Sequence, residues 1–227
     1  MNAPVQALLF DMDGTLIDSM PHHDTAWARW HAAHQLPFDS DRFFAKTAGR
    51  ANAEILCELL PLASAAEIAA LAEEKERLYR EIAAQSLVMI DGFEALRQAA
   101  RARGLKLAIC TAAPPENIAV ANARFGLDRQ VDTTVSPADG LRGKPHPDIF
   151  LEAARRLGVA PGACVVFEDA PLGVEAARRA GMRAVALTTS LEAEAFLSFD
   201  NLLAAVPDFT AFDLSALHNH NDERDEP

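Results

Sequence analysis

A run of four apolar residues that stops at two acids, close to the start of the chain, constrains this sequence more than any other feature. Residues 7–10 read Ala-Leu-Leu-Phe, and the next letters are DMDGT. A short apolar run closed by a turn signal is typical of a strand buried inside a parallel sheet. Asp11 and Asp13 follow the carboxyl end of that strand. Two carboxylates do not serve a hydrophobic core, so they indicate a functional site.

The two acids stand two residues apart, so along an extended chain their side chains lean to one side. Like charges that close raise each other's pKa unless a cation or a proton relieves the repulsion. Asp11 and Asp13 could therefore share a hard cation such as Mg²⁺, or divide the roles of nucleophile and acid/base. Gly14 allows a tight turn in which backbone amides can face an anionic substrate. An Asx-rich turn after a strand is the alternative interpretation.

Beyond residue 88 the sequence alternates between strand and helix patterns. The predicted strands cover residues 107–111, 131–135, 163–167 and 184–187, and the predicted helices cover 92–102, 115–124, 147–157 and 172–180. Such alternation implies a parallel sheet with right-handed crossovers, whose ligand chemistry lies at the carboxyl ends of the strands. A short strand at 202–206 and a final helix ending near Leu217 complete the pattern. We therefore expect a doubly wound α/β core domain made of residues 1–18 and 89–217.

Residues 19–88 show apolar residues at helical spacing and no strand signal. Ser64 followed by Glu67 is a capping-box pattern, and it opens a long amphipathic stretch at 68–84. This segment is predicted to be an all-α domain inserted into the core domain. Residues 218–227 read HNHNDERDEP and are predicted to be a disordered tail, because they are charged and lack large apolar residues.

The chain has 227 residues, of which half are apolar, so it can bury a substantial hydrophobic core. Its net charge of −12 argues against nucleic acid or an anionic membrane as a partner, because both bind clustered Lys and Arg. An acidic protein that handles phosphate needs a metal and a few well-placed cations. We expect a monomer or a weak homo-oligomer.

The three cysteines are odd in number and far apart, at Cys57, Cys110 and Cys164. Neither a disulfide framework nor a metal site is indicated, and reduced core cysteines in a cytoplasmic protein are the preferred interpretation. No apolar run approaches the length of a membrane span, and no export signal opens the chain.

Four polar residues mark other expected strand ends or a loop. Thr111 ends a predicted strand in ICTAAP, where its hydroxyl and the amide of Ala112 are suited to hold a phosphate oxygen. Lys144 lies in GLRGKPHPD, where an ammonium can neutralise carboxylates and a phosphoryl group together. Glu168 and Asp169 follow the strand at 163–167 and suit a Mg²⁺ site. The alternatives are a common strand-end Thr, a solvated loop Lys and an Asp that caps a helix.

Taken together, these segments resemble the four ordered motifs of the haloacid dehalogenase-like phosphohydrolases, over residues 5 to about 190. The strings that carry the resemblance are FDMDGTLIDS, ICTAAP, GKPHPD and FEDAPLGVEAARRAGM. The resemblance implies that Asp11 attacks phosphorus and becomes an aspartyl-phosphate. It implies that Asp13 protonates the leaving oxygen and then activates the hydrolytic water.

The same resemblance implies a magnesium ion as cofactor. An Asp11 oxygen, the main-chain carbonyl of Asp13 and the carboxylate of Asp169 would bind the ion, with Glu168 in or near the outer shell. Lys144 and Thr111 would clamp the transferring phosphoryl group.

The inserted helical segment resembles the cap domain of the beta-phosphoglucomutase-like branch of that family. Its first helix and its long helix match the branch at His23, Trp27 and Lys75. The match implies that His23 and Lys75 orient Asp13 or meet the substrate when the cap closes. Without it, Trp27 is a core residue and Lys75 lies on a solvated helix face.

Two departures bear on the reaction. The mutases of that branch carry an Arg where this chain has Asn52, and an A-S-K string where this chain has Ala112-Ala113-Pro114. A mutase must grip a bisphosphate in two orientations, so the loss of these groups favours a phosphatase of small phosphorylated metabolites, above all sugar phosphates. Arg50 could still bind a different substrate. A sugar phosphomutase and a non-catalytic regulatory binding module on the same fold are the alternatives.

Overall fold

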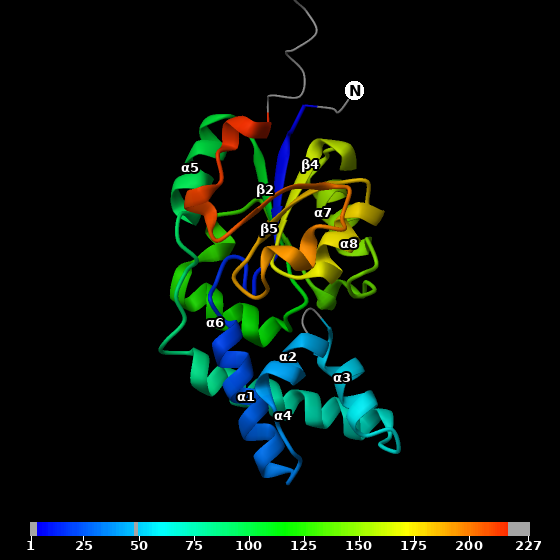
Figure 1. Cartoon of the computed structure of the whole chain (residues 1–227). Helices are drawn as coiled ribbons and strands as arrows, with labels where there is room; N and C mark the ends of the chain where they lie inside the picture. The colour runs from blue at the N-terminus through cyan, green and yellow to red at the C-terminus, as the bar shows by residue number, and fades with distance from the viewer. Residues whose placement is uncertain (1–3, 48–49, 218–227) are drawn as a thin grey trace, which may run out of the picture.

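A domain built on a parallel sheet forms the larger part of the molecule, and a bundle of helices forms the smaller part (Figure 1). The computed structural model describes residues 4–47 and 50–217. The sheet has the strand order β3-β2-β1-β4-β5-β6, with every neighbouring pair parallel. The strands are β1 (Ala7–Phe10), β2 (Lys106–Cys110), β3 (Thr133–Val135), β4 (Cys164–Glu168), β5 (Arg183–Leu187) and β6 (Leu202–Val206).

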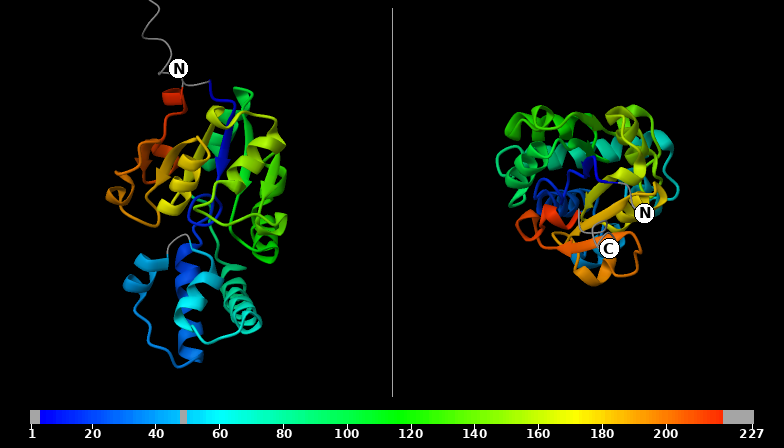
Figure 2. Two further views of the ribbon diagram at one scale, coloured as in Figure 1. Left: turned by 90° about the vertical axis from the view of Figure 1, so that its right-hand side faces the viewer. Right: turned by 90° about the horizontal axis from the view of Figure 1, so that it is seen from above.

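Helices cover both faces of this sheet (Figure 2). They are α5 (Phe93–Ala102), α6 (Pro115–Phe125), α7 (Asp148–Leu157) and α8 (Pro171–Arg179). Strand β1 shows why two layers are needed, because its side chains alternate between the faces. Leu8 and Phe10 pack into the hydrophobic cluster under α5 and α6, whereas Ala7 and Leu9 pack under α7 and α8. The predicted doubly wound α/β class is confirmed.

Strand β1 lies at the point where the sheet order reverses. It pairs with β2 on one side and with β4 on the other, so that Phe10 is level with Ile109 and Phe167. The residues that leave the carboxyl ends of these strands therefore emerge next to one another. Such a switch point is where ligands bind in open α/β sheets.

Helices α1 to α4 form a separate bundle below the sheet in Figure 1, and we call residues 19–88 the cap and the sheet-containing part the core domain. The bundle consists of α1 (Met20–Ala33), α2 (Ser40–Thr47), α3 (Asn52–Leu59) and α4 (Ala65–Ala83). It encloses a hydrophobic cluster of its own, in which Trp27 and Trp30 are buried. Ser64 and Glu67 form the predicted capping box at the start of α4.

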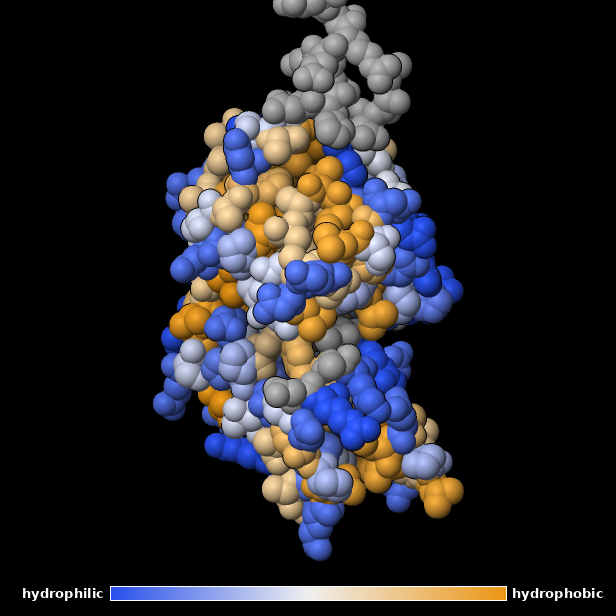
Figure 3. Space-filling view, viewed as in Figure 1, coloured by the Kyte–Doolittle hydropathy of each residue, from blue (hydrophilic) through white to orange (hydrophobic). Residues whose placement is uncertain are grey.

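Two linking segments, around residues 17–18 and 88–89, connect the cap with the core domain and lie side by side. Ile17 forms an antiparallel bridge with Met89, and the Asp18 N–H donates to the Val88 carbonyl at 3.0 Å. The α3–α4 loop lies at the opposite end of the cap and leaves Leu62 99% exposed. Figure 3 shows hydrophobic residues on the surface at this end of the cap.

Some predictions need correction. The final segment ends in two 3₁₀ turns, Phe209–Ala211 and Leu214–Leu217, instead of the expected helix. The side chains of Asp208 and Asp213 accept hydrogen bonds from backbone N–H groups two residues later and so favour tight turns. Cys57 is exposed on α3, whereas Cys110 and Cys164 lie in the core as expected.

The predicted tail at 218–227 lies outside the described residues. Within the ranges 4–47 and 50–217, no helix combines the length and the apolar character that crossing a membrane requires.

Candidate active site

An ion-paired lysine joins two of the acids that follow strand ends. Lys144 Nζ lies 2.5 Å from Asp11 Oδ1 and also donates to Glu168 Oε1. The Asp11 side chain comes from the end of β1, that of Glu168 from β4, and that of Lys144 from the loop before α7. All three side chains are at least nine-tenths buried. Residues that are far apart in the sequence therefore meet at the carboxyl edge of the sheet.

Both carboxylate oxygens of Glu168 have donors. Besides Lys144, the backbone N–H groups of Asp169 and Ala170 donate to Oε2 at 3.1 and 3.2 Å. Gly173 on α8 leaves the space that this side chain fills, because a Cβ built there would lie 1.9 Å from Glu168 Cδ. Glu168 is thus held as a partner of the lysine.

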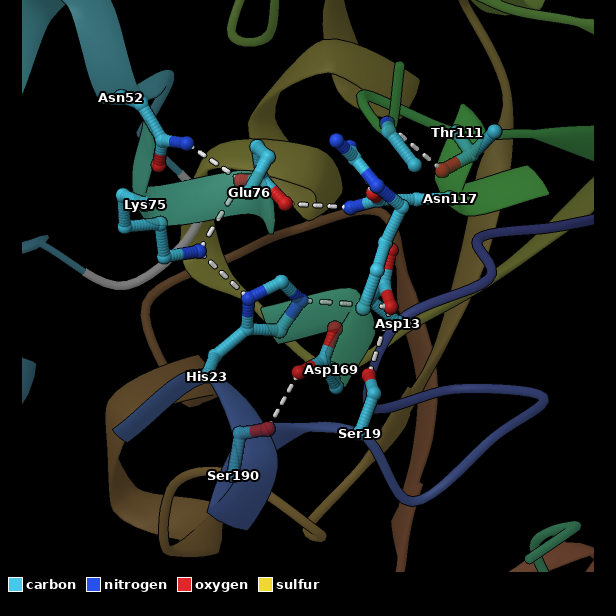
Figure 4. A network of polar contacts seen from close by, with 12 residues as sticks. Asp13, Ser19, His23, Asn52, Lys75, Glu76, Thr111, Asn117, Asp169 and Ser190 are labelled. Atoms are coloured by element: carbon cyan, nitrogen blue, oxygen red, sulfur yellow. Dashed lines mark hydrogen bonds and ion pairs between the residues drawn. The ribbon is translucent and has the colours of Figure 1, made fainter. Parts of the chain in front are cut away.

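Asp169 is oriented by two hydroxyl groups. Thr15 Oγ1 donates to its Oδ1 at 3.4 Å, and Ser190 Oγ donates to its Oδ2 (Figure 4). Gly14 has a different role from the expected one. Its N–H donates to the Ile17 carbonyl at 2.8 Å inside the turn, and a Cβ on Gly14 would meet Asp169 Oδ2 at 2.1 Å. Gly14 therefore makes room for a carboxylate, and its amide is not directed at a ligand.

The cluster has more negative than positive charge. Asp11, Glu168 and Asp169 are buried around the single ammonium of Lys144. Burial, reinforced by Glu168, raises the pKa of Asp169 to about 7, and burial raises the pKa of Asp11 well above its usual value against the pull of Lys144. Burial opposes the charge of Lys144, but Asp11 and Glu168 outweigh it and raise the lysine pKa.

A divalent cation would relieve this excess of negative charge, and oxygen donors are those that Mg²⁺ prefers. The side chains alone do not complete a site, because no three His, Cys, Asp or Glu residues in the described ranges are arranged to hold a metal ion. A metal ion at this edge of the sheet would also need main-chain oxygens, and the carboxylates of Asp11 and Asp169 are oxygen donors of the kind that fits Mg²⁺.

The Asp13 carboxylate lies between the core domain and the cap. Ser19 Oγ donates to its Oδ1 at 2.7 Å, and His23 Nε2 lies 3.6 Å from the same oxygen (Figure 4). Burial alone would raise the pKa of Asp13, but His23 and the Ser19 hydroxyl stabilise the carboxylate and hold its pKa below the usual value. Asp13 is therefore held in its ionised form, which is the form that can act as a base.

Behind His23 lies a chain of charged groups from the long cap helix α4. Lys75 Nζ is 2.6 Å from His23 Nδ1 and 3.0 Å from Glu76 Oε1 (Figure 4). An ammonium has no acceptor atom, so Nδ1 of His23 accepts and Nε2 carries the proton that faces Asp13. The His23 ring stacks on Tyr79, with the ring centroids 3.9 Å apart. Lys75 is 1% exposed, so the solvated alternative for this residue is wrong.

A cavity of about 610 Å³ lies between the cap and the core domain. The cap side of the cavity is lined by the predicted residues His23, Arg50 and Lys75. Its core side is lined by the predicted residues Asp11, Asp13, Thr111, Ala112, Lys144, Glu168 and Asp169. Thr111 Oγ1 accepts the N–H of Ala113 at 3.0 Å, which leaves its own proton for a ligand. Arg50 donates to Glu58 at 2.9 Å. Of the predicted site residues, Gly14 is the one absent from the cavity lining.

Sequence reasoning missed four residues that support the site. Glu76 accepts from Lys75 and Asn117 donates to Glu76, Ser190 orients Asp169, and Gly173 accommodates Glu168. Glu76 could have been indicated by its opposite charge next to Lys75. Gly173 could have been indicated by its place inside a predicted helix that follows two acids. Asn117 and Ser190 carry no such signal, because their partners are distant in the sequence.

The chain is similar to known phosphatases and to a solved hydrolase structure. The validoxylamine A 7'-phosphate phosphatase of Streptomyces hygroscopicus subsp. limoneus is 35% identical, over 86% of this chain and 91% of its own. The fructose-1-phosphate phosphatase YqaB of Escherichia coli (strain K12) is 34% identical, over 78% of this chain and 94% of its own. The crystal structure of a HAD hydrolase of family IA, variant 3, from Entamoeba histolytica HM-1:IMSS has a TM-score of 0.86 at 28% identity, and the match covers 94% of this chain and 97% of that one.

A family model described as haloacid dehalogenase-like hydrolase matches residues 5–181. That range contains all four motifs, from Asp11 through Thr111 and Lys144 to Asp169. The chain belongs to the haloacid dehalogenase-like hydrolase family.

Proposed function

We propose that this protein is a Mg²⁺-dependent phosphatase that hydrolyses small phosphorylated metabolites, above all sugar phosphates. The observation that carries the proposal is the buried Asp11–Lys144 pair at the end of β1, with Thr111 and Asp13 lining the same cavity. A nucleophile, a cation for the phosphoryl oxygens and an acid/base group are the parts that phosphoryl transfer through a covalent intermediate needs.

In the first half of the reaction, a carboxylate oxygen of Asp11 attacks phosphorus and the bond to the leaving oxygen breaks. Lys144 and the Thr111 hydroxyl bind the phosphoryl oxygens, and Asp13 gives its proton to the leaving alcohol. In the second half, Asp13 takes a proton from water, whose oxygen attacks phosphorus and releases Asp11 and phosphate. The pKa of Asp13 is low without substrate, and a neighbouring phosphoryl dianion raises it, so that Asp13 can act as the acid.

Asp11, the Asp13 carbonyl and Asp169 would hold the Mg²⁺ ion, which when bound offsets the charge of the phosphoryl group and its nucleophile. His23 donates from Nε2 toward Asp13 and is itself oriented by Lys75. We infer that these two cap residues keep Asp13 directed at the leaving oxygen. The Lys75–His23 hydrogen bond and the 3.6 Å contact of His23 with Asp13 connect the cap to the acid/base group, so a closed cap both excludes water and completes the site.

The cavity wall near Asn52 and Ala112 favours hydrolysis of a monophosphate over a mutase reaction. Asn52 donates to Glu76, and the core wall presents Ala112, Ala113 and Pro114. A second phosphate group would meet a buried carboxylate and apolar groups there. The phosphatase names of two relatives, one acting on fructose 1-phosphate and one on validoxylamine A 7'-phosphate, support the same choice.

The test is phosphate release from a panel of sugar, polyol and amino-sugar monophosphates, with Mg²⁺ supplied or removed by EDTA. We expect release that needs Mg²⁺ and falls on the order of 10⁴-fold or more in Asp11→Asn. Glucose 1-phosphate is assayed in parallel for isomer formation, with and without a bisphosphate primer. Isomer formation that outpaces phosphate release would establish the mutase instead, and no turnover of any compound would favour a binding module.

A further inference from the structure

One asparagine of the core domain forms hydrogen bonds with two side chains of the long cap helix α4. Asn117, on α6, donates from Nδ2 to Glu76 Oε2 at 2.5 Å and accepts from Arg80 Nη1 at 3.2 Å (Figure 4). Both partners belong to α4, one turn apart. In the part of the chain that the structure describes, the side-chain hydrogen bonds from α4 to the core domain all end on Asn117. The two ends of its amide group are thus both used across the domain boundary.

Glu76 connects this contact to the acid/base group. Its Oε1 accepts from Lys75 and from Asn52, while its Oε2 accepts from Asn117. Lys75 in turn donates to His23. The carboxylate is 7% exposed and has donors from three directions, so its position is defined by its neighbours in both domains.

The arrangement is specific to a cap that lies against the core domain. If α4 moves away from α6, Glu76 loses one of its three donors and Arg80 loses the carbonyl oxygen of Asn117. The remaining contacts of Glu76, to Lys75 and Asn52, lie within the cap. Of these three hydrogen bonds to Glu76, only the one from Asn117 would be lost when the cap opens.

We propose that Asn117 is a positioning residue for the reaction, which holds the closed cap through Glu76 and Arg80 and so keeps the Lys75–His23 pair on Asp13. Asn117 lines the cavity, and its contacts toward Asp13 run through Glu76, Lys75 and His23. Its role is therefore to select the arrangement in which His23 is in place. This inference rests on the proposed phosphatase function for its kinetic readout only.

The decisive variant is Asn117→Asp. Asp has the same shape as Asn, so a residue that only fills space would tolerate it. Here the change replaces the donor to Glu76 by a like charge in a buried site, which repels the carboxylate. We expect kcat/KM for the best monophosphate to fall about 10- to 100-fold, the equivalent of one charged hydrogen bond. Asn122→Asp is the matched control on the same helix, because Asn122 uses its oxygen to accept the Asp128 N–H and Asp can do the same.

The reciprocal variant tests the contact itself. In Glu76→Gln/Asn117→Asp, the amide and the carboxylate change places, so a hydrogen bond between positions 76 and 117 forms again and Arg80 faces a carboxylate. We expect the double variant to lose less kcat/KM than the product of the two single losses. Independent effects that multiply would overturn the proposal.

Cap closure is measured without turnover by the distance between two spin labels. Leu62 on the cap and Leu197 on the core domain are 99% and 74% exposed, so Leu62→Cys and Leu197→Cys can be labelled in a Cys57→Ser background, since the other two cysteines are buried. With Mg²⁺ and inorganic phosphate, we expect a narrow distance distribution for the parent protein, a broader and longer one for Asn117→Asp, and recovery in the double variant.

The outcomes separate this proposal from the proposed function. Parent-like distances and kcat/KM within twofold in Asn117→Asp would overturn the role of Asn117 while the phosphatase stands. A parent protein that hydrolyses no phosphate ester but still shows the broadening in Asn117→Asp would sink the proposed function and retain the cap contact.

Discussion

Replacing Gly173 by alanine should have two opposing effects on stability, a gain in helix propensity and a steric clash with Glu168. Gly173 lies in helix α8, where Ala is normally preferred over Gly by about 1 kcal/mol. Its Cβ, however, would lie 1.9 Å from Cδ and 2.0 Å from Oε1 of Glu168. Glu168 is 1% exposed and is held by Lys144 and by two backbone N–H groups, so it has no free direction in which to move.

The steric effect should therefore exceed the helix propensity. Overpacking of a buried position costs about 1–3 kcal/mol, and loss of a charge-assisted hydrogen bond between Glu168 and Lys144 adds about 1.5–3 kcal/mol. After subtracting the helical gain of about 1 kcal/mol, we expect Gly173→Ala to lower the free energy of unfolding by about 1.5–5 kcal/mol. Phosphate release should fall as well, because Lys144 is displaced from Asp11.

The assay is urea unfolding followed by far-UV circular dichroism, with phosphate release on the same preparations. Gly162→Ala is the control, since a Cβ there meets nothing within 4 Å. Adding Glu168→Ala to Gly173→Ala removes the clash and leaves the helical gain, so the double variant should be about 1 kcal/mol more stable than Glu168→Ala alone. If Gly173→Ala is as stable as the parent, or more stable, the reasoning from the contact with Glu168 is refuted.

Three further predictions concern the metal and the cap. Mg²⁺ should raise the Tm of the parent protein and of Ser190→Ala but not of Asp169→Asn; equal shifts in all three would exclude Asp169 as a ligand. Ser190→Ala should weaken Mg²⁺ binding by about tenfold in a titration followed by Tm, because the hydroxyl that orients Asp169 is lost. Burial would raise the pKa of Glu76, but Lys75, His23 and Asn117 outweigh it and lower the pKa from 4.5 to about 2. The stability that the Glu76 carboxylate contributes is therefore present above pH 4.5 and is lost as the pH falls toward 2. The free energy of unfolding in urea should fall between pH 6 and 2 by up to about 3 kcal/mol less in Glu76→Gln than in the parent protein. Parallel curves of unfolding free energy against pH for both proteins would contradict this prediction.

The strand ends could be predicted because their signals are local. An apolar run cut short by acids places Asp11 at the edge of a parallel sheet, and the same rule places Thr111 and Glu168 at that edge. Neighbouring strands then bring them together without any knowledge of side-chain contacts. Lys144 follows only through the resemblance, because a loop lysine carries no physical signal of its partners.

The contacts across the domain boundary could not be predicted in this way. Asn117 and Glu76 meet because α4 and α6 pack against each other, and no periodicity in the sequence encodes the relative position of two domains. Gly14 was expected to serve a substrate through its amide, yet the space it leaves for Asp169 is visible only in three dimensions. The exposure of Cys57 likewise depends on tertiary context, whereas the 3₁₀ turns near Leu217 follow from local side-chain contacts of Asp208 and Asp213.

The aromatic residues of the cap have a practical consequence for spectroscopy. The chain contains two Trp and one Tyr, which are Trp27, Trp30 and Tyr79, and all three belong to the helices of the cap. Fluorescence excited near 295 nm, where only indole absorbs, would thus come from the cap alone, while the sheet emits nothing in that channel. A melt followed by emission would track the cap alone, whereas one followed by ellipticity would track the cap and the core domain together. Any gap between their midpoints would show that the two domains unfold independently.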